Sequence, residues 1–285
     1  MRPWLWRRVR APYIPRVKQR LRVGAVPYLV ARPINYGLED EDTVEYVRDV
    51  PARLIERLRS GALDVALVSS IELFRVPGYS YLAGPVVAGQ GYVASVQLFL
   101  RRPVGQLGSV LLDPSSRAAQ ALLAITLAPR EPRAVLQQVE ASVDVRQAAQ
   151  ARDAGGWLRI GDRALVEALS DGAPPAFNPS EAWRKDTGLP FVFATWVVRP
   201  GVQLTREHLE LFRRAQTRGA AELERLADEA AQAWALPLAA CRKYLLEECW
   251  YAPGAQLEPA LLAFRDRAAA LGLCDGALSP TAIAL

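Results

Sequence analysis

Two long apolar runs divide this chain and limit the folds open to it. Val93–Leu100 (V-A-S-V-Q-L-F-L) and Phe191–Val198 (F-V-F-A-T-W-V-V) each have the composition of a buried strand. The stretch between them alternates short strands with helices and spans about 95 residues, which is within the usual size of a domain. The two runs therefore predict an α/β chain of two lobes, in which two long strands join the second lobe to the first.

The first lobe begins with the pattern of a parallel α/β unit. Arg22–Val26, Thr43–Arg48 and Leu63–Val68 are predicted strands, and Pro51–Arg59 is a predicted helix with proline in its first turn. Polar residues, Ser70 among them, follow the ends of these strands. Because open α/β sheets bind ligands at the carboxyl ends of their strands, we expect a site at this edge.

The remaining segments complete the predicted organisation. Residues 1–20 form a basic leader that we expect to be poorly ordered and outside the fold. Residues 21–97 form the first part of lobe 1, residues 98–194 form lobe 2, and residues 195–285 return to lobe 1. From Leu204 onward apolar residues recur at helical spacing, so this return segment is predicted to be helical.

The net charge of +5 comes from the leader and not from the folded body. Residues 1–22 hold eight Lys and Arg and no acid, so the rest of the chain has 27 basic against 30 acidic residues. A nucleic-acid-binding protein carries positive charge on the binding face of its fold, so we expect no nucleic-acid partner. No apolar run approaches the roughly 20 residues of a membrane span, so we expect no integral membrane segment.

Three cysteines and one histidine argue against several kinds of site. Cys241, Cys249 and Cys274 form no CxxC pair, and an odd count without a secretory signal favours reduced thiols in a cytoplasmic protein. Cys241 and Cys249 are expected to pack on one apolar face of a helix. His208 lies at a predicted helix start, where we expect a surface position. A Ser-His-Asp triad or a histidine metal site is therefore not expected.

A short strand that ends in polar residues is the best candidate for an anion site. Val110–Leu112 is followed by Asp113-Pro114-Ser115-Ser116-Arg117 and then by a predicted helix, Ala118–Leu127. Ser and Asp at a helix start satisfy N–H groups that have no partner within the helix. Exposed amides, the helix dipole and an arginine together attract a carboxylate or phosphate. The alternative is an ordinary N-cap beside a solvated arginine.

Six motifs in a fixed order give the sequence a resemblance to a known family. They are V-G-A-V-P-Y-L, D-V-A-L-V-S-S-I-E, S-V-Q-L-F-L, L-D-P-S-S-R, I-G-D-R-A-L and W-R-K-D-T-G-L-P-F-V-F-A-T-W. Over about residues 21–250 they resemble the chorismate dehydratase family, which opens the futalosine route to menaquinone.

The resemblance implies a fold, a reaction and a set of site residues. The fold is a type II periplasmic-binding-protein-like fold with two hinge strands, and no metal or organic cofactor is implied. The reaction removes water from chorismate and gives 3-[(1-carboxyvinyl)oxy]benzoate, with the substrate's own enolpyruvyl carboxylate taking the proton. The implied site has Ser95 as catalytic and substrate-binding residue, with further substrate contacts from Ser70, Ser115, Ser116, Arg117, Gly161, Asp162, Thr187 and Gly188.

Two of these assignments compete with plain structural roles. Asp162 could equally cap a helix, and Ser95 could bond a neighbouring backbone group. Large aromatic residues near the second long strand are expected in the core and not as a stacking platform; these are Trp183, Phe191, Phe193 and Trp196.

Several positions depart from the family's motifs. Val30 stands where an asparagine is usual, Ala118 and Ala119 replace two hydroxyl residues, and Ser69 replaces a proline.

Two alternative functions stay open. One is the sister synthase that makes 1,4-dihydroxy-6-naphthoate, whose proposed base is a histidine, although His208 lies on the helical return segment. The other is a protein that binds a small carboxylate without converting it.

Overall fold

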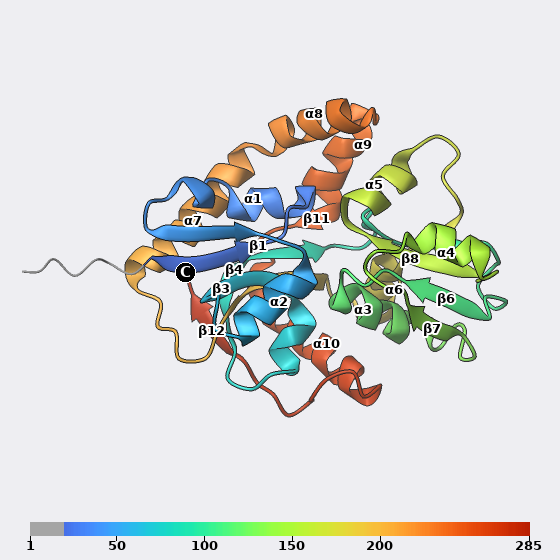
Figure 1. Cartoon of the computed structure of the whole chain (residues 1–285), viewed down its shortest axis with the longest axis horizontal. Helices are drawn as coiled ribbons and strands as arrows, with labels where there is room; N and C mark the ends of the chain where they lie inside the picture. Colours follow the sequence, from blue (N-terminus) through green and yellow to red (C-terminus); the bar gives the residue numbers. More distant parts are fainter. Residues whose placement is uncertain (1–19) are drawn as a thin grey trace, which may run out of the picture.

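A computed structural model describes residues 20–285 and places them in two α/β lobes, each built on its own sheet (Figure 1). The predicted leader lies outside the described residues except for its last position. None of the helices in the described part of the chain is long and apolar enough to cross a membrane.

The larger lobe is built on a seven-stranded sheet with strand order β11-β4-β10-β3-β1-β2, and β12 pairs with β4. β1, β2 and β3 are parallel, and β10 runs antiparallel to both β3 and β4. Every residue of β3 is buried, as predicted for an apolar strand covered on both faces. The strands are β1 (Leu21–Ala25), β2 (Val44–Arg48), β3 (Val65–Ser69), β4 (Ser80–Gly89), β10 (Phe191–Val198), β11 (Cys249–Trp250) and β12 (Thr281–Ala284).

Helices cover both faces of this larger sheet, with α1 and α7 on one face and α2 and α10 on the other (Figure 1). Their apolar residues recur at helical spacing, and this periodicity is visible in the sequence. The elements are η1 (Leu29–Ala31), α1 (Arg32–Asn35), η2 (Leu38–Asp40), α2 (Pro51–Arg59), η3 (Ser70–Phe74), α7 (Arg206–Ala221), α8 (Leu223–Trp234), α9 (Leu238–Lys243), η4 (Tyr244–Glu248), η5 (Gly254–Gln256) and α10 (Leu257–Ala270).

The smaller lobe is built on a five-stranded sheet with strand order β7-β6-β8-β5-β9. β6, β7 and β8 are parallel, and β5 runs antiparallel to β8 and β9. Its elements are β5 (Val96–Leu100), β6 (Ser109–Leu112), α3 (Arg117–Leu127), β7 (Val135–Gln138), α4 (Val145–Ala151), β8 (Gly156–Ile160), α5 (Gly161–Leu169), β9 (Ala176–Phe177) and α6 (Pro179–Thr187).

The chain crosses between the lobes twice, through residues 90–95 and through residues 188–190. We call the first of these the hinge segment. Neither long apolar strand spans both sheets: β5 pairs only in the smaller sheet and β10 only in the larger. The expected boundary at residue 194 is therefore wrong, because the first residues of β10 already pair with β3 and β4.

The return segment is mostly but not purely helical. β11 and β12 add two short strands beside β4, which corrects the prediction of a helical segment. The predicted helix through Cys241 and Cys249 is divided into α9, the π-helix η4 and β11. Both thiols are buried, as expected, but they lie on different elements and not on one helix face.

Candidate functional site

A pocket lies between the two lobes, where the carboxyl ends of parallel strands from both sheets meet. In lobe 1, β1 leads into η1 and β3 into η3; in lobe 2, β6 leads into α3 and β8 into α5. This is the edge at which open α/β sheets place their ligands. The pocket has a cavity volume of about 70 Å³ and is lined by Val26, Tyr28, Val30, Pro51, Leu67, Val68, Ser69, Val87, Ala88, Val93, Ser95, Val96, Ser116, Ile160, Gly161, Phe193, Ala194 and Cys249.

The lining is apolar apart from a few hydroxyl groups. Ser69, Ser95 and Ser116 contribute their hydroxyls, and none of the lining residues has a carboxylate, an amine or an imidazole. Burial raises the pKa of Cys249 to about 12, so its thiol stays neutral at physiological pH. Polar contacts to a ligand in this pocket must therefore come from hydroxyl groups and backbone amides.

The predicted helix start at Ser116 is confirmed, and it faces the pocket. Ser116 is the N-cap of α3, and its Oγ accepts a hydrogen bond from the N–H of Ala119 at 3.2 Å. Asp113 Oδ1 accepts from the N–H of Ser115 at 2.8 Å. Because the positive end of the α3 dipole lies at the pocket, a carboxylate placed there would be stabilised. The role of Ser115 and Ser116 in binding substrate stays a prediction.

Arg117 is engaged by a protein carboxylate and does not line the pocket. Its Nη1 lies 3.1 Å from Oε1 of Glu72, which is 1% exposed. One residue further, the N–H of Ala118 donates to Oγ of Ser69 at 3.4 Å. Arg117 and Ala118 belong to lobe 2, whereas Glu72 and Ser69 belong to lobe 1. These contacts therefore link the lobes beside the pocket.

Ser95 lies in the hinge segment and lines the pocket; its predicted catalytic role stays a prediction. It is 4% exposed, and its backbone carbonyl accepts a hydrogen bond from the N–H of Gly161 at 2.9 Å. Burial raises the pKa of the Tyr244 phenol in η4, and the Ser95 hydroxyl partly offsets this rise. Ser95 is thus the pocket serine that lies at the first crossing between the lobes.

Six of the nine expected contact residues lie outside the pocket lining, namely Ser70, Ser115, Arg117, Asp162, Thr187 and Gly188. Ser70 Oγ donates to the carbonyl of Val192 at 2.6 Å. Thr187 Oγ1 donates to the carbonyl of Trp183 at 2.8 Å, and Gly188 ends α6 with a φ of 71°. Ser70, Thr187 and Gly188 fix the second crossing and the start of β10, and in this arrangement they do not reach a ligand.

Asp162 does not cap α5, which corrects one of the two roles considered for it. The N-cap of α5 is Ile160, and no side chain caps this helix. Instead, Asp162 Oδ1 accepts a hydrogen bond from the N–H of Leu29 in the other lobe at 3.0 Å. Burial raises the pKa of Asp162 to about 6. Beside it, Gly161 has a φ of 68° and would place a Cβ 3.3 Å from the ring of Tyr28.

Replacing Asp162 with asparagine is expected to stabilise the protein at pH 8 by about 1–2 kcal/mol. Asparagine keeps the acceptor for Leu29 but removes a buried charge. A carboxyl whose pKa is raised on folding favours the native state at low pH, and this contribution is lost as the pH rises through about 6. The Tm advantage of the variant, followed by thermal unfolding, should therefore be present at pH 8 and shrink below pH 4.

Asp162→Ala is the control, because it removes the acceptor as well as the charge. It should be less stable than Asp162→Asn at every pH. If wild type and the asparagine variant have parallel Tm profiles from pH 4 to pH 8, the buried-charge argument is wrong.

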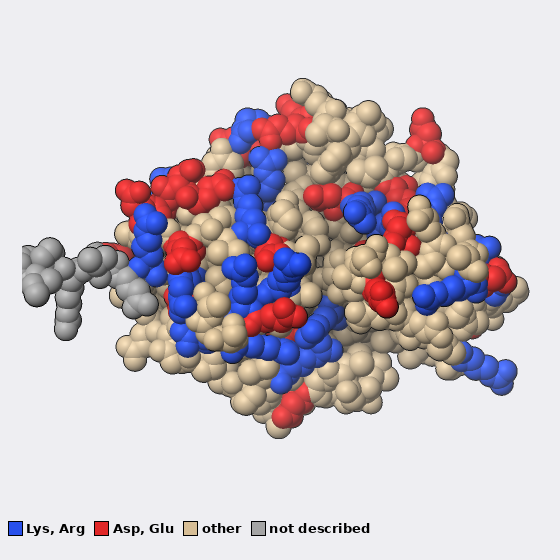
Figure 2. Space-filling model, viewed as in Figure 1, with Lys and Arg blue, Asp and Glu red and all other residues tan. Residues whose placement is uncertain are grey.

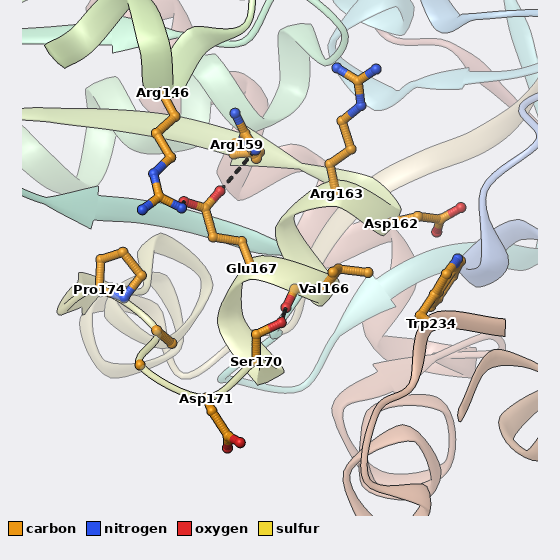
Figure 3. A pocket seen from close by; sticks show the side chains of 12 residues that line it. Arg146, Arg159, Asp162, Arg163, Val166, Glu167, Ser170, Asp171, Pro174 and Trp234 are labelled. Atoms are coloured by element: carbon orange, nitrogen blue, oxygen red, sulfur yellow. Dashed lines mark hydrogen bonds and ion pairs between the residues drawn. The ribbon is translucent and has the colours of Figure 1, made fainter. Parts of the chain in front are cut away.

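A second hollow lies against α5, outside the pocket lining (Figure 3). Glu167 lies between Arg146 and Arg159, with N–O distances of 3.2 and 3.0 Å (Figure 3). Trp234 of lobe 1 lines the opposite side of the hollow (Figure 3). Burial raises the pKa of Glu167. Acidic and basic side chains are also interspersed over the face of the molecule that Figure 2 shows. The hollow is thus a largely self-neutralised surface feature.

Several pocket residues were not among the expected contacts. Val30 and Ser69 line the pocket at positions that the sequence marks only as departures from the family's motifs. Tyr28 lies in the first motif, but nothing in the sequence shows that its ring covers Gly161. Phe193 also lines the pocket, although Trp183, Phe191 and Trp196 are core residues as expected.

Comparison with known proteins gives this arrangement a family. A family model described as menaquinone biosynthesis matches residues 21–270. The chain is also similar to a chorismate dehydratase of Thermus thermophilus, with 28% identity over 267 residues that cover 88% of this chain and 95% of that protein.

Solved structures confirm the predicted periplasmic-binding-protein-like fold. A protein of Archaeoglobus fulgidus superposes with a TM-score of 0.69 at 16% identity, covering 90% of this chain and 99% of that one. The aliphatic sulphonate-binding protein of Escherichia coli has a TM-score of 0.61 at 16% identity, covering 93% and 94%. The alkanesulfonate-binding protein of Xanthomonas axonopodis bound to MOPS has a TM-score of 0.64 at 18% identity, covering 93% and 98%.

Proposed function

The chain belongs to the menaquinone biosynthesis family, and from this premise we propose that it is a hydro-lyase that removes water from chorismate to give 3-[(1-carboxyvinyl)oxy]benzoate. The observation that carries the proposal is the pocket between the lobes, which offers hydroxyl groups and a helix start but no carboxylate, amine or imidazole in its lining. A relative at 28% identity that is named for this reaction supports it.

The pocket suits a small dianion with an apolar ring. Chorismate carries two carboxylates, which need strong hydrogen-bond donors when they are buried. The Ser95 and Ser116 hydroxyls and the first amides of α3 can supply donors. Apolar side chains, Val30 and Phe193 among them, can pack on the ring. No residue of the lining presents a negative charge that would repel the substrate.

The reaction needs little acid–base chemistry from the protein. The proton on C3 and the hydroxyl on C4 leave together as water, a C3–C4 double bond forms, and the ring becomes aromatic. The enolpyruvyl carboxylate of the substrate can accept the proton from C3 and pass it to the departing C4 oxygen, so that water is released in a substrate-assisted elimination. The task left to the protein is to hold one conformer, exclude water and stabilise the developing charge on the leaving oxygen.

The sister synthase is not favoured by any contact in the described part of the chain. His208 occupies the third position of α7, and its Nδ1 accepts a hydrogen bond from the N–H of Thr205 at 3.3 Å as part of a capping box. It is not among the residues that line the pocket between the lobes. A histidine base for that reaction would have to come from another residue, and the chain has one histidine.

The direct test is to incubate the purified protein with chorismate and without added metal, and to follow the mixture by chromatography with mass detection. We expect a product lighter than chorismate by one water, with the absorbance of a benzoate. Chorismate alone controls for its spontaneous rearrangement. Tight chorismate binding without product would favour a non-catalytic binder, and absence of both would overturn the proposal.

A further inference from the structure

The π-helical element η4 contacts the backbone next to Ser95 and has no role so far in the proposed reaction. η4 is a five-residue π-helix that directly precedes β11 and contacts the hinge segment. π-Helical turns are rare and occur frequently beside functional sites. The neighbouring Cys249 lines the pocket together with Ser95, so η4 lies directly behind the pocket wall.

Glu248, the last residue of η4, contacts the hinge segment at two points. Its side-chain Oε2 accepts a hydrogen bond from the N–H of Ala94 at 2.8 Å, and its backbone carbonyl accepts from the N–H of Gln90 at 3.3 Å. Glu248 is 8% exposed, and burial raises the pKa of its carboxyl. Within residues 20–285 Glu248 forms no ion pair, and the charge of Lys243 only partly offsets the burial of its carboxyl. Burying a carboxylate without a paired cation is unfavourable, so its place next to Ser95 calls for a reason beyond stability.

The hinge segment is also held from the other lobe. Asn178 Nδ2 donates to the carbonyl of Val93 at 2.9 Å and to the carbonyl of Val96 at 3.3 Å. Ser95 therefore lies between backbone groups that are fixed on both sides. Ala94 is the residue directly before it, and the Glu248 carboxylate fixes the amide of Ala94.

Taking the proposed dehydration as its premise, we propose that η4 is the positioning element for Ser95 and that Glu248 is its positioning residue, acting through the amide of Ala94. By anchoring the peptide group before Ser95, Glu248 fixes the backbone that carries Ser95 in the pocket wall. A hydroxyl that must meet a developing charge contributes most when its direction is set before the reaction begins.

The test compares Glu248→Ala with Glu248→Gln and Glu247→Ala. Alanine removes the acceptor for Ala94, whereas glutamine keeps it. Glu247 is the same residue type one position earlier but is exposed, so it controls for a change of charge in η4. We expect Glu248→Ala to lower kcat about tenfold with KM changed less than about threefold, Glu248→Gln to restore most of the rate, and Glu247→Ala to match wild type.

A double-mutant cycle separates positioning from general destabilisation. In a Ser95→Ala background, Glu248→Ala should lower the remaining kcat by less than about twofold, because the hydroxyl it positions is absent. Equal losses in both backgrounds would overturn the inference while leaving the dehydratase proposal intact. So would a glutamine variant that is as slow as the alanine variant.

Hydrogen exchange tests the same inference without substrate. Peptides covering residues 90–95 should exchange faster in Glu248→Ala than in wild type, Glu248→Gln or Glu247→Ala. If wild type fails to dehydrate chorismate, the proposed function fails, and this exchange pattern still decides whether Glu248 anchors the hinge segment. Unchanged exchange in Glu248→Ala would overturn the positioning role whatever the reaction.

Discussion

Replacing Ser95 with alanine is expected to lower kcat for chorismate dehydration about 100-fold while KM changes less than about threefold. Ser95 lies at the crossing between the lobes and is one of the few hydroxyl residues in a largely apolar lining. In such surroundings one donor aimed at a developing negative charge contributes far more than it would in water. Steady-state kinetics that follow the benzoate product measure both constants.

Ser70→Ala is the matched control for this prediction. The motif resemblance implies a substrate contact for both serines. Ser70 Oγ, however, donates to the carbonyl of Val192, and Ser70 lies outside the pocket lining. Its loss should lower Tm, since a buried acceptor is left unpaired, and should leave kcat within about twofold of wild type. The reverse pattern, with Ser70 essential and Ser95 dispensable, would contradict the placement of the site at the pocket between the lobes.

Most of the fold could be predicted because its elements are recorded in local patterns. The helix Pro51–Arg59 and the strand Phe191–Val198 have the same bounds in the structure as in the prediction. Their signals are a proline at a helix start and an unbroken apolar run. β11 and β12 could not be predicted in this way. They have two and four residues, and they exist because they pair with β4.

The site was predicted less completely, because sequence motifs identify residue types and not the directions of side chains. Arg117 is a residue type that commonly binds anions, yet it forms an ion pair with a carboxylate of the other lobe. Asp162 follows a strand in the manner of a helix cap, yet it accepts a hydrogen bond from Leu29. Both contacts join residues far apart in the chain. Such pairings depend on how the lobes close, which no local pattern records.

Replacing Glu72 with glutamine is expected to lower the free energy of unfolding by about 3 kcal/mol. Glu72 is 1% exposed, and its carboxylate contacts three arginines, Arg59 at 2.5 Å, Arg75 at 3.5 Å and Arg117 at 3.1 Å. Glutamine fills the same space but brings an amide with N–H donors toward guanidinium groups that have no acceptor to offer. Urea-induced unfolding measures the loss.

Two further variants distinguish this buried cluster from ordinary surface ion pairs. Arg117→Gln removes only the contact that comes from lobe 2, so it should destabilise by about 1 kcal/mol, less than the loss of Glu72. Glu210→Gln disrupts an exposed pair with Arg213 on α7 and should leave the unfolding midpoint unchanged. Equal midpoints for the Glu72 and Glu210 variants would contradict the claim that the Glu72 cluster holds the lobes together. If only the Glu72 and Arg117 variants lose stability, the arginine that the sequence predicted to bind substrate instead joins the two lobes.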